Sequence, residues 1–307
     1  MNKLKTNILN YLIFCENQKR LDSKTIKSYK IDLSQFSEFQ SNHYSDFINP
    51  NLLEDYISRL HNFFKPKTVK RKIASLKAFF HYLEYKDVIS INPFNKLQIK
   101  FREPVTLPKI IPLHAIEKFF STLYEQMKFA STAFQKKCIS RDIAVIELLF
   151  ATGMRISELC SLRLSDIDFI EKNILIYGKG SKERLIQICN NDVMAALRNY
   201  HTSFKSEIDS SGYFFINRIN NRLSEQSVRN MINKYTSISA IKLHITPHMF
   251  RHSFATYLLE KDVDIRYIQE MLGHSSINIT EIYTHVTMSK QKNILSTKHP
   301  RNSLMFK

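Results

Sequence analysis

The sequence predicts a mainly α-helical protein of two domains, the second of which also carries one small antiparallel sheet and is therefore of the α+β type. Three observations support this prediction. Apolar residues recur at helical spacing through the first hundred residues. A proline-rich segment follows. Beyond it, helical patterning dominates again except at residues 173–189, where two apolar runs of strand type flank a glycine-rich turn.

The first domain is expected to contain four helices. Apolar stripes at helical spacing predict the first two around residues 4–15 and 26–36, and Ser23 is expected to cap the second. A third apolar stripe follows Pro50. The fourth helix is expected to open at Pro66, because proline suits the first turn of a helix.

The domain boundaries are predicted from the prolines. Four prolines occur within twenty residues, and they are hostile to regular structure. We therefore expect a first domain over residues 1–103, a linker over 104–112 and a second domain over 113–307. In the second domain, Gly153 is expected to allow a tight turn between two helices, and residues 178–181 to form the turn of a β-hairpin.

The charge of the chain points to a polyanionic partner. The net charge is +17 and the pI is about 9.6. The first 103 residues carry 18 Lys and Arg against 10 Asp and Glu, and the remainder carries 27 against 18. Both domains are therefore basic, which suits a clamp around a DNA duplex better than a single basic tail would.

Other classes of protein are disfavoured. The four cysteines have neither a CxxC pair nor the spacing of a metal site, so no metal or other cofactor is expected, and the thiols suit a reducing cytoplasm. No apolar stretch approaches the roughly 18 residues needed to cross a bilayer, so a cytoplasmic protein without a membrane partner is expected. The GxxxxGK[ST] pattern of a phosphate-binding loop is absent, which disfavours ATP-driven work.

The most informative segment reads TPHMFRHSFATYLLEKDVDIRYIQEMLGHSSINITEIYTHV. A histidine and an arginine stand at i and i+3 in it, so one helix would direct both toward the same point. With an arginine and a lysine upstream, these side chains can surround one phosphodiester and leave a tyrosine hydroxyl free to attack it. The candidate catalytic residues are Arg155, Lys179, His248, Arg251, His274 and Tyr283.

These motifs resemble the tyrosine recombinase, or phage integrase, family. The resemblance rests on ATGMRISEL, YGKGSKER, HMFRHSFATYLLE, MLGHSS and EIYTHV, and it runs from about Leu4 to Arg301. It implies a SAM-like, four-helix core-binding domain followed by a catalytic domain. It also implies that DNA is cut and rejoined through a 3′-phosphotyrosyl intermediate and a Holliday junction, without metal or ATP.

The resemblance also assigns roles to residues. Arg155 and Arg251 are implied to clamp the scissile phosphate, and Tyr283 is the implied nucleophile. Lys179 is implied to be the general acid for the leaving 5′-oxygen, with Lys182 as a rival. The remaining members of the set are His248, which would donate a hydrogen bond or assist proton transfer at the nucleophile, and His274.

The first domain adds a candidate DNA-binding surface. Lys67, Lys70 and Arg71 lie on the face of the fourth helix opposite its apolar stripe, and Lys77 lies near the edge of that face. A solvated charged surface is the alternative. Next to a site that acts on a phosphodiester, contact with DNA phosphates is the better interpretation.

Within the family, the chain is most similar to the Xer-type resolvases of chromosome dimers. The expected partner is double-stranded DNA with a specific recombination site, bound by a homo- or hetero-tetramer, and a cell-division DNA translocase is a candidate activator. An integrase or transposase of a mobile element is the alternative. A type IB topoisomerase and a non-catalytic DNA-binding protein are less favoured.

Overall fold

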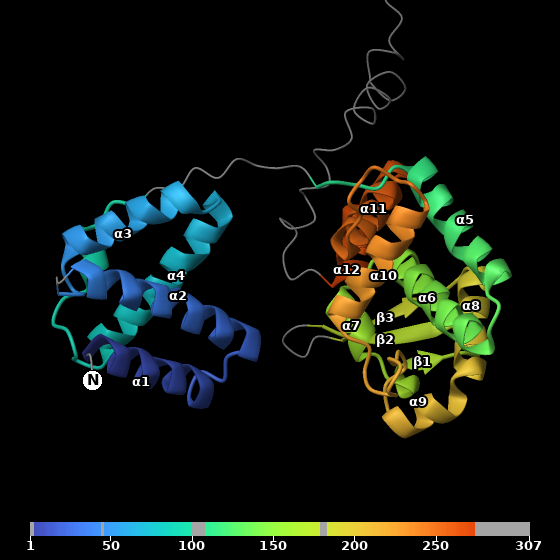
Figure 1. Ribbon diagram of the computed structural model, residues 1–307, viewed down its shortest axis with the longest axis horizontal. Coiled ribbons are helices and arrows are strands. Elements are labelled where there is room, and N and C mark those ends of the chain that lie inside the picture. Colours follow the sequence, from blue (N-terminus) through green and yellow to red (C-terminus); the bar gives the residue numbers. More distant parts are fainter. Residues whose placement is uncertain (1–2, 44–45, 100–107, 179–182, 274–307) are drawn as a thin grey trace, which may run out of the picture. The chain divides into compact units, whose positions relative to one another are not determined.

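The computed structural model describes residues 3–43, 46–99, 108–178 and 183–273. The chain forms two compact units, Met1–Val105 and Thr106–Lys307, which are described separately below (Figure 1). The mainly helical fold class predicted from the sequence is confirmed, including the small antiparallel sheet. No helix among the described residues is long and apolar enough to cross a membrane.

The first unit contains the four expected helices and a short 3₁₀ turn. Its core is rich in aromatic rings, with the buried Phe80 in edge contact with the rings of Phe36, Phe79 and Phe94. The apolar stripes read from the sequence are the faces that form this core. The elements are α1 (Lys3–Asn17), α2 (Ser23–His43), α3 (Pro50–Phe63), α4 (Pro66–Tyr85) and η1 (Pro93–Lys96).

Two helix starts of this unit were predicted from the sequence, one correctly and one wrongly. Pro66 is the first residue of α4, as predicted. The expectation that Ser23 caps α2 was wrong, because Ser23 is already the first helical residue. Asp22 takes the cap position, where its carboxylate accepts a hydrogen bond from the backbone N–H of Lys24 at 2.8 Å.

A buried ion pair joins α2 to α4. Asp32 and Lys72 are 1% and 2% exposed, and the ammonium of Lys72 donates to the Asp32 carboxylate at 3.0 Å. The Ser75 hydroxyl donates to the same carboxylate at 2.8 Å, and the guanidinium of Arg71 contacts it from the surface. Because a buried charge is costly unless it is fully paired, this group fixes how the two helices pack.

The second unit is built around α6, which is largely buried from Ile139 onward and packs against α5, α8 and α11 (Figure 1). The antiparallel sheet has the order β1-β2-β3. The elements are α5 (Leu113–Phe129), α6 (Ala133–Thr152), α7 (Ile156–Ser161), η2 (Leu164–Asp166), β1 (Ile167–Asp168), β2 (Asn173–Tyr177), β3 (Glu183–Gln187), α8 (Asn191–Ser203), α9 (Lys205–Ser211), α10 (Glu225–Ile238), α11 (Pro247–Glu260) and α12 (Ile265–Leu272).

The predicted hairpin is confirmed as β2 and β3, in which Ile174 pairs with Ile186 and Leu175 with Leu185. The predicted turn at residues 178–181 lies largely outside the described residues, because 179–182 are not described. The sequence did not predict β1, because a strand of two residues has no measurable alternation.

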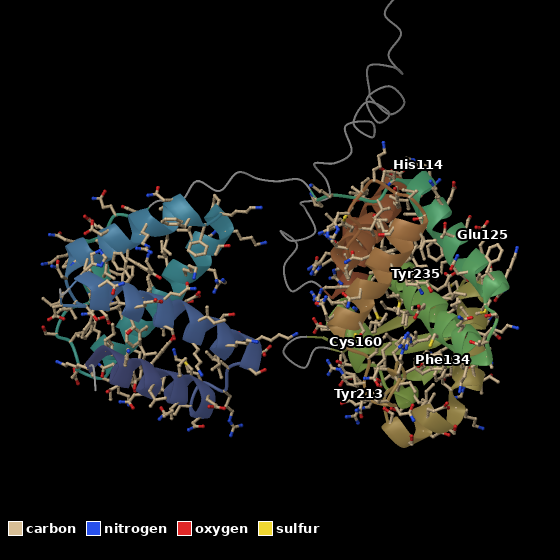
Figure 2. All side chains as sticks on the ribbon, viewed as in Figure 1. His114, Glu125, Phe134, Cys160, Tyr213 and Tyr235 are labelled. Atoms are coloured by element: carbon tan, nitrogen blue, oxygen red, sulfur yellow. The ribbon has the colours of Figure 1, made fainter. Side chains whose placement is uncertain are left out.

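A buried tyrosine and a buried aspartate join two helices inside the second unit. Tyr235 of α10, labelled in Figure 2, is fully buried and donates its hydroxyl to the carboxylate of Asp142 at 2.9 Å. Arg141 also donates to Asp142, at 2.9 Å. Burial raises the pKa of Tyr235, and the Asp142 charge acts in the same direction. The phenol therefore stays protonated and serves as a structural donor between α10 and α6.

Candidate active site

The carboxyl end of α12 is the point at which the candidate residues meet. The helix ends at Leu272, and Gly273 follows in the left-handed conformation with φ of 65°. The last carbonyls of a helix lack partners within it, so they need donors from elsewhere. Three guanidinium groups supply them: Arg184 Nε donates to Met271 O at 2.8 Å, Arg251 Nη2 to Leu272 O at 2.7 Å, and Arg155 Nη2 to Gly273 O at 3.4 Å.

Arg155 is placed by the turn between α6 and α7. Gly153 ends α6 with φ of 58°, as the sequence predicted, and the chain then enters α7 at Arg155. The Arg155 side chain is 34% exposed and donates through Nη1 to Glu158 at 2.7 Å. Arg155 therefore combines a fixed guanidinium with access to a ligand from solvent.

Arg251 joins three segments that are distant in the sequence. It lies on α11, which opens at Pro247 after the cap Thr246. Its guanidinium donates to Gly153 O at 2.9 Å as well as to Leu272 O, and the residue is 4% exposed. His248 lies one turn earlier on the same helix and is exposed. The i and i+3 arrangement predicted from the sequence is present in α11.

Glu158 is held between two arginines. It is 4% exposed in its side chain and accepts hydrogen bonds from Arg155 and from Arg184 of β3. Burial alone would raise the pKa of Glu158, but the hydrogen bonds and charge of Arg184, with the hydrogen bonds of Arg155, outweigh it and lower the pKa below its usual value. Glu158 is therefore a carboxylate at neutral pH.

His252 follows Arg251 on α11 and is partly buried. Burial lowers its pKa to about 4, and the neighbouring His248 and Arg251 charges act in the same direction. The imidazole is therefore neutral at pH 7, which fits a structural residue better than a proton donor.

Three of the six candidate catalytic residues fall within the described part of the chain. Arg155 and Arg251 meet at the end of α12, and His248 lies one turn from Arg251. Lys179, His274 and Tyr283 lie outside the described residues. In the sequence, Lys179 stands between the residues of β2 and those of β3, and His274 directly follows Gly273.

The candidate DNA-binding residues all lie on α4 with exposed side chains: Lys67, Lys70, Arg71 and Lys77. Arg71 is also paired with the buried Asp32, and the ammonium of Lys77 lies 5.9 Å from the ring centre of Phe94. The predicted basic face is therefore present on this helix, and Arg71 and Lys77 are among its members that contact neighbouring side chains.

Arg184 was not predicted from the sequence. It stands in the YGKGSKER motif, in which the lysines were the candidate residues. The signal was the period of the strand, because Arg184 lies on the same face of β3 as the buried Ile186. A charged residue on the core-facing side of a strand requires a buried partner, which here is Glu158.

Within the described ranges, no group of three or more His, Cys, Asp or Glu side chains could hold a metal ion. The end of α12 offers three fixed guanidinium groups, which are of the kind that bind phosphate oxygens.

Comparisons with known proteins decide the family. The sequence model described as "Phage integrase family" matches residues 120–290, and that described as "Phage integrase, N-terminal SAM-like domain" matches residues 8–86. This chain belongs to the phage integrase family. It is a tyrosine recombinase, an enzyme that cuts and rejoins DNA strands, and the first unit is a SAM-like domain.

Relatives of this tyrosine recombinase cover its whole length. A "Tyrosine recombinase" of Agathobacter rectalis is 60% identical over 100% of both chains. "Tyrosine recombinase XerC" of Thermodesulfovibrio yellowstonii is 34% identical over 96% of this chain and 95% of the relative. A solved structure of the XerH site-specific recombinase, bound to a palindromic difH substrate in a post-cleavage complex, shares the fold with a TM-score of 0.75 at 23% identity, over 92% of this chain and 82% of that one.

The turn at Gly153 yields a prediction for the recombinase. A Cβ on Gly153 would lie 2.6 Å from Phe254 Cδ1 and 2.9 Å from Leu272 Cδ2, in a left-handed backbone. Gly153→Ala is therefore expected to lower the midpoint of urea-induced unfolding. It should also slow DNA cleavage, because Arg251 donates a hydrogen bond to the Gly153 carbonyl and would be displaced with it. We expect a loss of about 2 to 4 kcal/mol in the free energy of unfolding.

Gly212→Ala is the matched control for this change. Gly212 has φ of 73° but nothing within 4 Å of its would-be Cβ, so it carries the backbone strain without the collision. We expect it to cost about 1 kcal/mol and to leave cleavage unchanged. Equal unfolding midpoints for the two variants would contradict the packing argument.

Proposed function

We propose that this enzyme is a site-specific recombinase of the Xer type that resolves chromosome or plasmid dimers in the cytoplasm. Its DNA partner would be a duplex with a specific recombination site, and a cell-division DNA translocase is the candidate activator. The relatives named XerC and XerD, 30–34% identical over at least 93% of this chain, support this reading. The observation that carries the chemistry is the meeting of Arg155 and Arg251 at the end of α12.

The proposed phosphate clamp follows from charge. In the transition state of phosphoryl transfer, negative charge gathers on the non-bridging oxygens, and fixed donors there contribute most of the acceleration. A guanidinium has five N–H donors, so its contacts to backbone carbonyls can orient it while others grip phosphate. Arg155 and Arg251 are oriented in this way by Gly273 O and Leu272 O.

Replacing either clamp arginine tests this role. Arg155→Ala and Arg251→Ala should each cost about 3 kcal/mol or more of activation free energy, because each removes a preorganised donor. The measurement is single-turnover cleavage of a nicked suicide substrate. Partial rescue by a neutral methylphosphonate at the scissile position would support the charge argument. A wild-type cleavage rate in either variant would contradict it.

We propose Tyr283 as the nucleophile that forms the 3′-phosphotyrosyl bond. Tyr283→Phe removes a single hydroxyl, so it should bind the core site with near wild-type affinity. Without that hydroxyl it should yield no covalent complex on a suicide substrate. Gel separation of the denatured products measures this. A trapped adduct in the variant would show that another residue attacks.

We propose Lys179 as the general acid for the leaving 5′-oxygen, with the nearby Lys182 as the control. A bridging 5′-phosphorothioate leaves without protonation, so it should restore cleavage to Lys179→Ala but not to Arg251→Ala. The two substrates are compared in single-turnover assays. Selective rescue of Lys182→Ala instead would transfer the role to that lysine.

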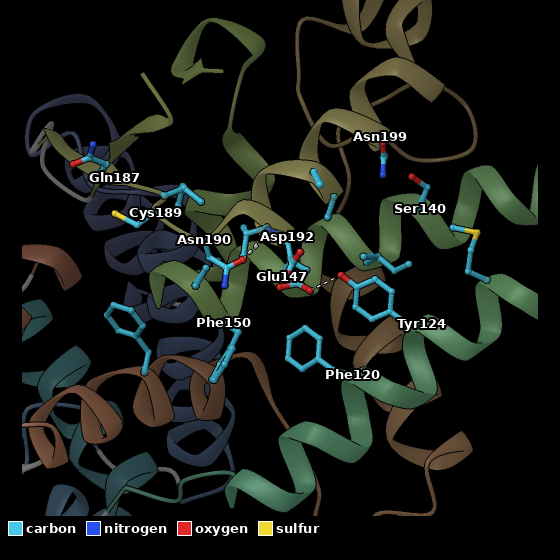
Figure 3. Close-up of a pocket in the computed structure, with 18 of the residues that line it drawn as sticks. Phe120, Tyr124, Ser140, Glu147, Phe150, Gln187, Cys189, Asn190, Asp192 and Asn199 are labelled. Atoms are coloured by element: carbon cyan, nitrogen blue, oxygen red, sulfur yellow. Dashed lines mark hydrogen bonds between the residues drawn. The ribbon is translucent and has the colours of Figure 1, made fainter. Parts of the chain in front are cut away.

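We further propose that four subunits assemble on two duplexes, since strand exchange requires four cleavages. The second unit offers an apolar groove of about 1040 Å³, here called the α5–α8 groove, lined by residues of α5, α6, α8 and α11 (Figure 3). Figure 3 shows Phe120 and Phe150 beside Glu147. The Glu147 carboxylate accepts a hydrogen bond from the Tyr124 hydroxyl at 2.5 Å. Burial raises the pKa of Glu147.

The proposed occupant of this groove is the segment 290–307 of a neighbouring subunit. The segment contains five basic residues and no acidic ones, which complements Glu147 and Asp192 in the groove. It also supplies apolar side chains to meet the aromatic lining: Ile294, Leu295, Leu304, Met305 and Phe306.

Deleting residues 290–307 tests the assembly. Single-site binding should persist, while cooperative pairing on a two-site core falls and strand exchange is lost, because the contact between subunits is removed. Ala195→Arg, which fills the groove from α8, should give the same result, and Ala133→Arg on the exposed start of α6 is its control. Band shifts and plasmid resolution assays measure the outcome.

Unchanged recombination by the truncated protein would reject this docking role. Efficient relaxation of supercoiled plasmid by a monomer would favour the topoisomerase interpretation instead.

A further inference from the structure

We propose that Arg184 is a positioning residue of the recombinase, which preserves the positive charge of Arg155 by neutralising Glu158. The proposal rests on the proposed function of Arg155 as a phosphate clamp. It concerns three side chains from two elements: Arg155 and Glu158 at the start of α7, and Arg184 on β3.

The Glu158 carboxylate is fully engaged by its two neighbours. Oε1 accepts from Arg155 Nη1 at 2.7 Å and from Arg184 Nη1 at 3.2 Å. Oε2 accepts from Arg184 Nη2 at 2.7 Å and from the backbone N–H of Arg155 at 2.8 Å. Arg184 therefore binds both oxygens in the paired geometry of a guanidinium and a carboxylate, whereas the Arg155 side chain uses only one of them.

The charges of the three groups do not cancel. Two guanidinium groups face one carboxylate, so the cluster carries one net positive charge. The side chains of Arg184 and Glu158 are 8% and 4% exposed, whereas Arg155 is 34% exposed. The excess charge is therefore presented to solvent at Arg155, where a phosphate can approach.

Without Arg184, this balance would change. Glu158 would remain a buried carboxylate whose remaining cationic neighbour in this cluster is Arg155. Charges interact strongly where water is excluded. The carboxylate would therefore bind the Arg155 guanidinium through both oxygens, and the positive charge of Arg155 would be cancelled. A neutral pair has little attraction for the charge that develops on the scissile phosphate.

A second contact of Arg184 supports a role in the site. Its Nε donates to Met271 O at 2.8 Å, on the same helix end that holds Arg155 and Arg251. A Cβ on Gly273 would lie 3.0 Å from Arg184 Nη1, so the glycine leaves room for this side chain. Arg184 thus links the hairpin strand β3 to both α7 and α12.

A charge-balancing role can be separated from a merely structural one by a second substitution. Arg184→Gln should slow single-turnover cleavage of a suicide substrate by about tenfold or more, with the dissociation constant for the core site within about twofold. Adding Glu158→Gln should then restore at least about tenfold of that rate, because Arg155 regains its uncompensated charge. Rates are compared per folded enzyme, with the folded fraction of each variant measured by circular dichroism, because removing the orphaned Glu158 carboxylate would also restore stability. A merely structural role predicts equal rates per folded enzyme in the single and double variants.

Two further variants complete the test. Arg184→Lys keeps the charge and should retain most of the rate, and Arg229→Gln, which breaks the surface pair with Glu225, should cleave as the wild type does. The double variant removes both buried charges, so it tests the proposal even where Arg184→Gln does not fold. The proposal is overturned if the double variant cleaves no faster than Arg184→Gln. If Arg184→Gln does not fold, the proposal is overturned when the double variant is as inactive as Arg155→Ala.

The failure of this inference is distinguishable from that of the proposed function. If Arg155→Ala is inactive while Arg184→Gln cleaves normally, only the role of Arg184 is rejected. If Arg155→Ala itself cleaves at the wild-type rate, the phosphate clamp is rejected and the role of Arg184 with it.

Discussion

The candidate active site depends on the carbonyls at the end of α12 that have no partner within the helix. A helix end that faces the protein needs donors, and here the donors are guanidinium groups from three separate elements: Arg155 at α7, Arg184 on β3 and Arg251 on α11. The same guanidinium groups satisfy the carbonyls of the helix end and supply the positive charge of the candidate site. The helix end orients the arginines, and the arginines in turn hold the helix end at Met271, Leu272 and Gly273.

Much of the fold could be predicted because burial imposes a period on the sequence. The stripe that begins with Leu4 and Ile8 is the buried face of α1, and Gly153 and Gly273 each stand where a left-handed turn ends a helix. Local rules failed where neighbouring residues compete for one role. Asp22 rather than Ser23 caps α2, because the carboxylate stands one position earlier and reaches the backbone N–H of Lys24.

The candidate site could be predicted only in part. Arg155 and Arg251 stand in distinctive motifs, but nothing in their spacing shows that both reach the last turn of α12. The same holds for Asp32 and Arg184, which have long-range partners, Lys72 and Glu158. A buried charge on a core-facing position signals that a partner exists, whereas the identity of the partner depends on tertiary packing.

The most direct test of the account is to map the DNA adduct of the wild-type enzyme. Trypsin should release residues 267–290 as one peptide, since no Lys or Arg lies between Tyr267 and Lys290. Mass spectrometry of this peptide from a trapped suicide complex should find the nucleotide on Tyr283. An adduct on the exposed Tyr267, or on a peptide from elsewhere in the chain, would contradict the account.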